Sequence, residues 1–179
     1  MYRVMNSKKQ IIRITRNAVM LALLCVIGMF SLPLGDNIKV SLQLLMVFII
    51  GLTSASVIDA VIVTGLYLVI GLLIPVYAGF TAGVTPTFGF VISFVVLVIP
   101  LYFLNKLPIK NQFLRMAIAC LASLIVCYTI GATFLALYLK LNIQKALLIA
   151  VVPYIPFDIV KIVIAVLVVS LLPKRSSSL

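Results

Sequence analysis

Asp158 and Lys161 are the residues whose type and spacing most clearly suggest chemistry in this chain of 179 residues. They stand in the segment PFDIVK (156–161), inside an otherwise apolar stretch near the C-terminus. An ionisable residue within a membrane-spanning helix costs on the order of 2.5–3.5 kcal/mol of insertion free energy. Because the two residues are three positions apart, they would share one helical face and offset each other's charge.

The position of this pair within its helix favours a ligand. Proline lacks an amide donor and suits the first turn of a helix, so we expect the final helix to begin near Pro156. Asp158 then lies in the first turn, where the helix dipole favours an anion. Lys161 gains nothing from that dipole, and a carboxylate or ligand explains it better. A structural ion pair between helices is the alternative; we expect a polar pocket open to the outside.

Several uncharged residues could complete such a pocket. Gln43 lies in the segment VSLQLL, and a buried amide needs a hydrogen-bond partner. Tyr77, Gly79 and Thr87 belong to a stretch rich in glycine and threonine, where glycine permits close approach of the backbone. Tyr128 offers an aromatic wall and a hydroxyl. Packing or turn formation is an alternative role for each of them.

The composition indicates that lipid is the solvent for much of the chain. Hydrophobic residues make up 65% and charged residues 9%, with a mean hydropathy of +1.36. Soluble domains are nearer half apolar and a quarter charged. Histidine is absent and the acids are Asp36, Asp59 and Asp158, which excludes a histidine metal site, a histidine triad and a carboxylate cage. Asp59, close to Ser54 and Ser56, suits a helix cap or an interfacial residue rather than a ligand.

Apolar runs of about 20 residues predict membrane-spanning helices. We expect an all-α integral membrane protein with six such helices, of which the last begins near Pro156 and ends at 172. The others cover 17–34, 40–51, 58–74, 87–104 and 116–139, and 146–152 forms a separate short piece. The chain would be one domain: a basic cytoplasmic arm (1–16), a six-helix bundle (17–172) and a cytoplasmic tail (173–179).

The net charge of +11 is explained by topology, and we expect no binding of nucleic acid. With both termini in the cytoplasm, basic residues concentrate inside, as the positive-inside rule requires. The inner set is Arg3, Lys8, Lys9, Arg13, Arg16, Lys106, Lys110, Arg115, Lys174 and Arg175; the outer set is Lys39, Lys140 and Lys145.

The first helix carries two small residues four positions apart, Ala18 and Ala22. Such spacing allows a second helix to approach closely within lipid. Internal packing is the alternative interpretation.

The ordered segments of the chain resemble the BioY family, the biotin-binding S components of energy-coupling factor (ECF) transporters. The resemblance covers nearly the whole chain and rests on VSLQLL (40–45), GLYLVIGLLIPVYAG (65–79), PTFGFVISF (86–94), YTIGATFLALY (128–138) and PFDIVK. Two features depart from the family: the loop after the third helix has fewer glycines, and Phe90 stands where many members have tyrosine.

The resemblance implies a six-helix S-component fold in a prokaryotic plasma membrane. It implies an outward-facing pocket for biotin, formed by Asp158, Lys161, Gln43, Tyr77, Gly79, Thr87 and Tyr128. It also implies that Ala18 and Ala22 contact a membrane coupling protein, which works with a pair of cytoplasmic ATPases. The chain itself has no G-x-x-x-x-G-K-[ST] loop, so an ATP-driven step needs these partners. No cofactor and no catalysed reaction are expected.

The chemistry of biotin suits these residues. Asp158 can accept a ureido N–H, Lys161 can donate to the ureido carbonyl or the carboxylate, and Gln43 can do both kinds of work. Apolar walls suit the ring and chain, as in most small-ligand sites. An S component for another small vitamin is the nearest alternative, followed by a membrane enzyme or a structural assembly protein.

Overall fold

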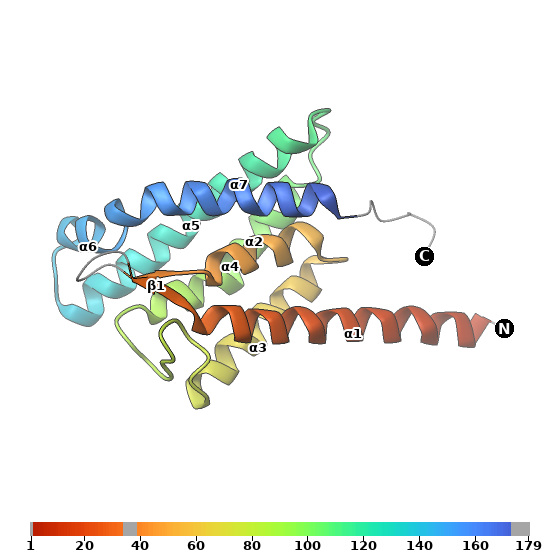
Figure 1. Ribbon diagram of the computed structural model, residues 1–179, viewed down its shortest axis with the longest axis horizontal. Coiled ribbons are helices and arrows are strands. Elements are labelled where there is room, and N and C mark those ends of the chain that lie inside the picture. The colour runs from red at the N-terminus through yellow and green to blue at the C-terminus, as the bar shows by residue number, and fades with distance from the viewer. Residues whose placement is uncertain (1, 34–38, 173–179) are drawn as a thin grey trace.

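The computed structural model describes residues 2–33 and 39–172, which form a helical bundle (Figure 1). Its six main helices are α1 (Tyr2–Met29), α2 (Gln43–Thr53), α3 (Val57–Leu73), α4 (Phe88–Leu104), α5 (Gln112–Leu139) and α7 (Ile155–Leu171). A short helix, α6 (Ile143–Ala150), and a 3₁₀ turn (Val152–Tyr154) join α5 to α7. Strands β1 (Ser31–Pro33) and β2 (Lys39–Ser41) pair antiparallel between α1 and α2. The prediction of six main helices and one short piece is confirmed.

The helices differ in how far they could span a bilayer. Within the described residues, three stretches are long and apolar enough to cross by themselves: Gln10–Met29, Gln112–Leu139 and Ile143–Leu171. Helices α2, α3 and α4 are apolar but shorter, with 11 residues in α2 and 17 in each of the others. The last of these stretches includes α6, the 3₁₀ turn and α7.

Helix α1 begins much earlier than predicted, at Tyr2 rather than Asn17. Residues 2–16 contain no proline or glycine that would stop a helix, so the helix continues through the basic segment. It ends at Met29; the predicted end at residue 34, like the predicted tail at 173–179, lies outside the described residues. Helix α2 begins at Gln43 rather than 40 because β2 occupies residues 39–41.

Side-chain caps explain the other shifted boundaries. Asn111 accepts hydrogen bonds from the amides of Phe113 and Leu114, so α5 begins at Gln112 rather than 116. Asn142 caps α6 in the same way, so this helix begins at Ile143, three residues before its predicted start. The final helix begins within one residue of the predicted Pro156.

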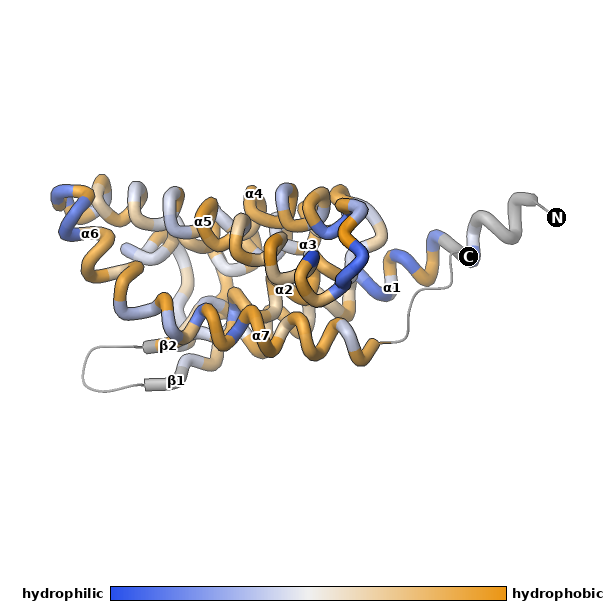
Figure 2. Tube along the Cα trace, turned by 90° about the horizontal axis from the view of Figure 1, so that it is seen from above, coloured by the Kyte–Doolittle hydropathy of each residue, from blue (hydrophilic) through white to orange (hydrophobic). Residues whose placement is uncertain are grey.

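The two ends of the bundle are built differently (Figure 1). One end holds the start of α1, the end of α7, the turn between α2 and α3 and the connection between α4 and α5. The other end holds the β-hairpin, the loop at 74–87 and α6. Figure 2 shows apolar residues along the middle of the bundle and hydrophilic segments towards these ends. Both described chain ends therefore lie on the same side, as an even number of spans requires.

Helix α2 forms the centre of the bundle. It packs against α1, α4 and α7, and eight of its eleven residues are buried. The largest fully buried side chains include Tyr67 and Phe48. Apolar side chains that remain exposed are numerous on α1, α3, α5 and α7, including Val26, Leu66, Ile125 and Leu167. These outer faces form the surface that a bilayer would cover.

Candidate ligand-binding pocket

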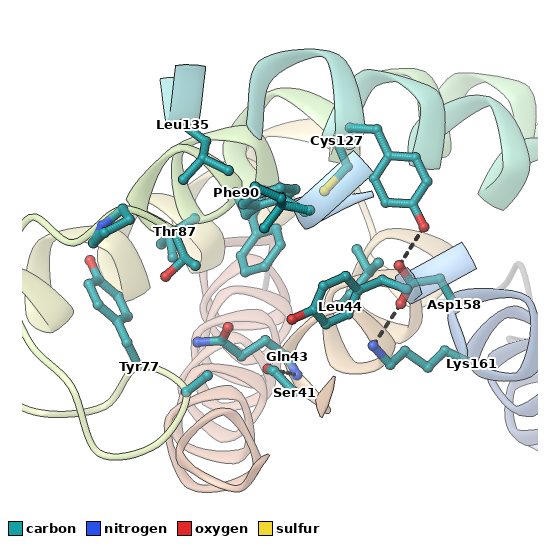
Figure 3. A pocket seen from close by; sticks show the side chains of 18 of the residues that line it. Ser41, Gln43, Leu44, Tyr77, Thr87, Phe90, Cys127, Leu135, Asp158 and Lys161 are labelled. Atoms are coloured by element: carbon teal, nitrogen blue, oxygen red, sulfur yellow. Dashed lines mark hydrogen bonds and ion pairs between the residues drawn. The ribbon is translucent and has the colours of Figure 1, made fainter. Parts of the chain in front are cut away.

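A cavity of about 370 Å³ opens at the end of the bundle that holds the hairpin and α6 (Figure 3). Its walls come from β2, α2, α4, α5, α6, α7 and the loop at 74–87. The polar side chains that line it are Ser41, Gln43, Tyr77, Thr87, Tyr128, Tyr154, Asp158 and Lys161. The apolar lining includes Leu44, Phe90, Val91, Phe94, Cys127, Leu135, Leu139 and Ile149. A few polar groups on mostly apolar walls are typical of a small-ligand site.

The charged pair lies deep in this lining. Lys161 Nζ is 2.7 Å from Asp158 Oδ1, and the two side chains are only 8% and 5% exposed. The Tyr128 hydroxyl donates a hydrogen bond of 2.6 Å to the other carboxylate oxygen, Oδ2. Tyr128 thereby connects α5 to α7, whereas the ion pair itself lies within α7. Asp158 also occupies the first turn of α7, as expected.

Lys161 keeps hydrogen-bonding capacity that the protein does not use. An ammonium group has three N–H donors. Among the described residues, its only acceptor is Asp158. A buried donor without a partner is costly, so the remaining N–H groups are available to an acceptor that enters the cavity.

Gln43, at the start of α2, also lines the cavity and is held by a relay of hydrogen bonds. Its side-chain amide donates to the hydroxyl of Tyr67, which in turn donates to the carbonyl of Val76 at 2.9 Å. Tyr67 is fully buried behind the cavity and does not line it. The carboxamide oxygen of Gln43 has no hydrogen-bond donor among the described residues, so it can accept one from a ligand.

The loop residues divide into two groups. Tyr77 and Thr87 line the cavity, and the Tyr77 hydroxyl donates to the carbonyl of Leu68 at 2.6 Å. Gly79 does not belong to the lining. Its φ of 73° favours glycine, and its N–H donates to the carbonyl of Met29 at 3.0 Å. Gly79 therefore shapes the loop against the end of α1.

Most of the apolar wall of the cavity was not predicted from the sequence. Phe90, Val91 and Phe94 follow Thr87 on α4 at spacings of three, four and seven residues. Leu135 lies seven residues after Tyr128 on α5. These spacings place side chains on one helical face, so periodicity counted from the two polar residues could have identified them.

The opposite end of the bundle holds a second buried carboxylate. Asp59 accepts hydrogen bonds of 2.7 Å from both Arg13 Nε and Asn17 Nδ2. Arg16 lies 3.9 Å from its other oxygen. Ser56, rather than Asp59, caps α3, since its hydroxyl oxygen accepts from the Asp59 amide.

The small residues of α1 remain accessible. Ala18 and Ala22 are both exposed and lie one turn apart. No group of three or more cysteine or aspartate side chains that could hold a metal occurs within residues 2–33 and 39–172.

Comparisons with known proteins agree with this architecture. The sequence model of the BioY family matches residues 4–178. The biotin transporter BioY of Thermotoga maritima is 28% identical over 171 residues, which cover 90% of this chain and 96% of that protein. The crystal structure at 2.1 Å of the S-component for biotin from an ECF-type ABC transporter matches with a TM-score of 0.79, at 23% identity over 90% of each chain. The predicted S-component fold is confirmed.

Proposed function

The chain belongs to the BioY family, and from this premise we propose that it is the substrate-binding subunit, or S component, of a biotin transporter. In this role it captures biotin within the membrane and hands it on without chemical change. The relative from Thermotoga maritima is named a biotin transporter, and the matching crystal structure is that of an S-component for biotin. The observation that carries the proposal is the buried Asp158–Lys161 pair in the wall of the cavity.

The free hydrogen-bonding groups of the cavity complement those of biotin. The ureido group of biotin has two N–H donors and one carbonyl, and the molecule ends in a carboxylate. Asp158 and the Gln43 carboxamide oxygen can accept the ureido N–H groups, while Lys161 donates to a carbonyl or carboxylate oxygen. Phe90 and Leu135 offer apolar contact to the fused rings and the carbon chain.

We also propose how the protein is oriented in the membrane. The cavity faces the outside of a prokaryotic plasma membrane, and residues 1–16 and 173–179 face the cytoplasm in a single-domain chain. In support, the start of α1 and the connection after α4 lie at the same end, and both carry basic residues. Ala18 and Ala22 then belong to the face that meets a membrane coupling protein, which an ATPase pair drives.

Binding of labelled biotin to the detergent-purified protein tests the proposal. We expect saturable binding that weakens at least about 100-fold in Asp158→Asn and Lys161→Ala, since each removes part of a buried charged contact. Lys110→Ala, which changes an exposed basic residue at the other end, serves as the matched control and should bind normally. Unchanged affinity in both pocket variants would remove the assignment of the site.

A competition panel identifies the ligand. Unlabelled biotin should displace the label, whereas riboflavin, thiamine and pantothenate should not. Displacement by one of these three vitamins, without binding of biotin, would instead support an S component for that vitamin.

A further inference from the structure

A second cavity, of about 610 Å³, forms a groove between α1 and α3 at the end opposite the ligand pocket. Its lining changes character along α1. Gln10, Arg13 and Asn17 supply polar groups, and Ile14, Leu21 and Ile62 supply apolar ones. The apolar part extends towards the middle of the bundle, since Leu21 lies two turns beyond Arg13 on the same helix.

Arg13 presents a fixed positive charge at the polar part of this groove. Its Nε is 2.7 Å from Asp59 Oδ1, and its Nη2 donates to the Ser56 hydroxyl at 2.9 Å. Its other terminal amino group, Nη1, has no hydrogen-bond partner within the described part of the chain. The side chain is 47% exposed, so a ligand can reach it.

Asp59 also lines the groove, but its carboxylate is almost wholly covered. Its side chain is 2% exposed and is covered by Arg13, Arg16 and Asn17. Arg13 and Arg16 both lie beside this one carboxylate, so the described charged side chains at this site sum to a positive charge. Asp59 orients the planar guanidinium of Arg13, the group best suited to hold a phosphate by two parallel hydrogen bonds.

We propose that the groove binds one anionic phospholipid, with its phosphate at Arg13 and an acyl chain along Ile14 and Ile62. A cationic head site that continues into an apolar channel complements an amphiphile of negative charge. Basic pockets between membrane helices bind anionic headgroups in this manner. Ala18 also lines the groove, so in the free subunit the lipid would cover part of the small-residue face of α1 and would have to leave before the coupling protein could dock there.

Lipid titration of the full-length protein in detergent tests this inference. Dioleoylphosphatidylglycerol and dioleoylphosphatidylcholine are compared by native mass spectrometry and by the shift in Tm. We expect the phosphatidylglycerol to remain bound as one copy and to raise the Tm more than the phosphatidylcholine. Arg13→Gln should raise its half-saturating concentration at least about fivefold, because one basic contact is lost. Lys110→Gln, an exposed basic change outside the groove, should leave it unchanged.

A second variant keeps the test independent of the Arg13–Asp59 pair. Ile62 is 46% exposed, so Ile62→Trp can fill the apolar part of the groove without disturbing the core. It should weaken phosphatidylglycerol binding while the protein stays folded. Equal binding of the two lipids, or normal binding by both groove variants, would overturn the inference. Full competition by glycerol 3-phosphate would also overturn it, because the site would then recognise a free anion rather than a lipid.

Discussion

Asp59 and Asp158 are both buried carboxylates in the first turn of a helix, each paired with a base, yet they lie at opposite ends of the bundle. The partner of Asp59, Arg13, comes from another helix and is half exposed. The partner of Asp158, Lys161, comes from the same helix and is buried. The first pair therefore joins α1 to α3 at the surface, and the second lies in the wall of a cavity.

This difference separates an anchor from a binding site. The Asp59 pair ties two helices together and desolvates only one of its partners. The Asp158 pair desolvates both partners, and its attraction only partly offsets that cost. Lys161 also retains donors that no described residue satisfies. The Asp158–Lys161 pair lies within one helix and lines a cavity, and Lys161 still has free hydrogen-bond donors. Such a pair is better suited to binding a ligand than to stabilising the fold.

The largest effect is expected when the pocket pair is broken on one side. Lys161→Met leaves Asp158 buried and unpaired, so the free energy of unfolding should fall by about 3–5 kcal/mol. The double variant Asp158→Asn/Lys161→Met should recover most of this loss, and neither variant should bind biotin. Unfolding in mixed detergent and dodecyl sulfate micelles measures the stability. A single variant as stable as the wild type would show that the pair carries no buried charge.

Substitution of a buried glycine by alanine can crowd the packing near either end of the bundle, and two glycines form a matched pair for this test. A Cβ at Gly131 would clash with the Phe90 ring, and one at Gly51 would clash with the Leu101 side chain. Each change to alanine should cost about 1–3 kcal/mol of stability. Only Gly131→Ala should also weaken biotin binding, because Phe90 lines the cavity. Equal affinities in titration calorimetry would indicate that Phe90 does not contact the ligand.

Removal of the charge of Asp59, in the pair with Arg13, should affect stability but not biotin binding. Asp59→Asn weakens the charged hydrogen bonds from Arg13 and Asn17, but Arg13 can turn to solvent. We expect a loss of about 1–2 kcal/mol in the free energy of unfolding. The affinity for biotin should stay within about twofold of the wild type. Asp59 lies at the opposite end of the bundle from the cavity, and distant sites that share no contacts act independently. A larger loss of affinity would mean that the two ends are coupled.

The smallest effect is expected from removal of the Tyr128 hydroxyl, which donates a hydrogen bond to the Asp158 carboxylate. Tyr128→Phe removes one hydrogen bond to Asp158, which should weaken biotin binding by about fivefold, or about 1 kcal/mol. Tyr138→Phe, on the same helix but outside the cavity lining, is the matched control. An equal change in both variants would assign the effect to α5 rather than to the pocket.

The sequence predicted those parts of the molecule that depend on local pattern. Hydropathy identified the six main helices, and Pro156 marked the start of the last helix to within one residue. The spacing of Asp158 and Lys161 placed them on one face because the helix geometry alone determines it. Whether biotin contacts them stays a prediction.

Features that depend on packing between distant segments were not predictable. The hydrogen bond from Tyr128 to Asp158 requires α5 to lie against α7, which neither helix specifies by itself. The relay from Gln43 through Tyr67 to Val76 likewise joins three segments. Gly79 suited a loop contact by type, but its backbone bond to Met29 turns it away from the cavity lining. The hairpin between α1 and α2 was missed because strands of three residues carry little pattern.

The balance of charge in the cavity has an electrical consequence. Asp158 and Lys161 are the only charged residues of its described lining, and they cancel. The vacant carrier would therefore present no net charge at this site to the membrane voltage. When the biotin anion is bound, the site has one net negative charge. Moving this charge across the membrane to a negative interior costs ~2.3 kcal/mol per 100 mV of membrane potential. Import of the biotin anion through this site would therefore be electrically uphill.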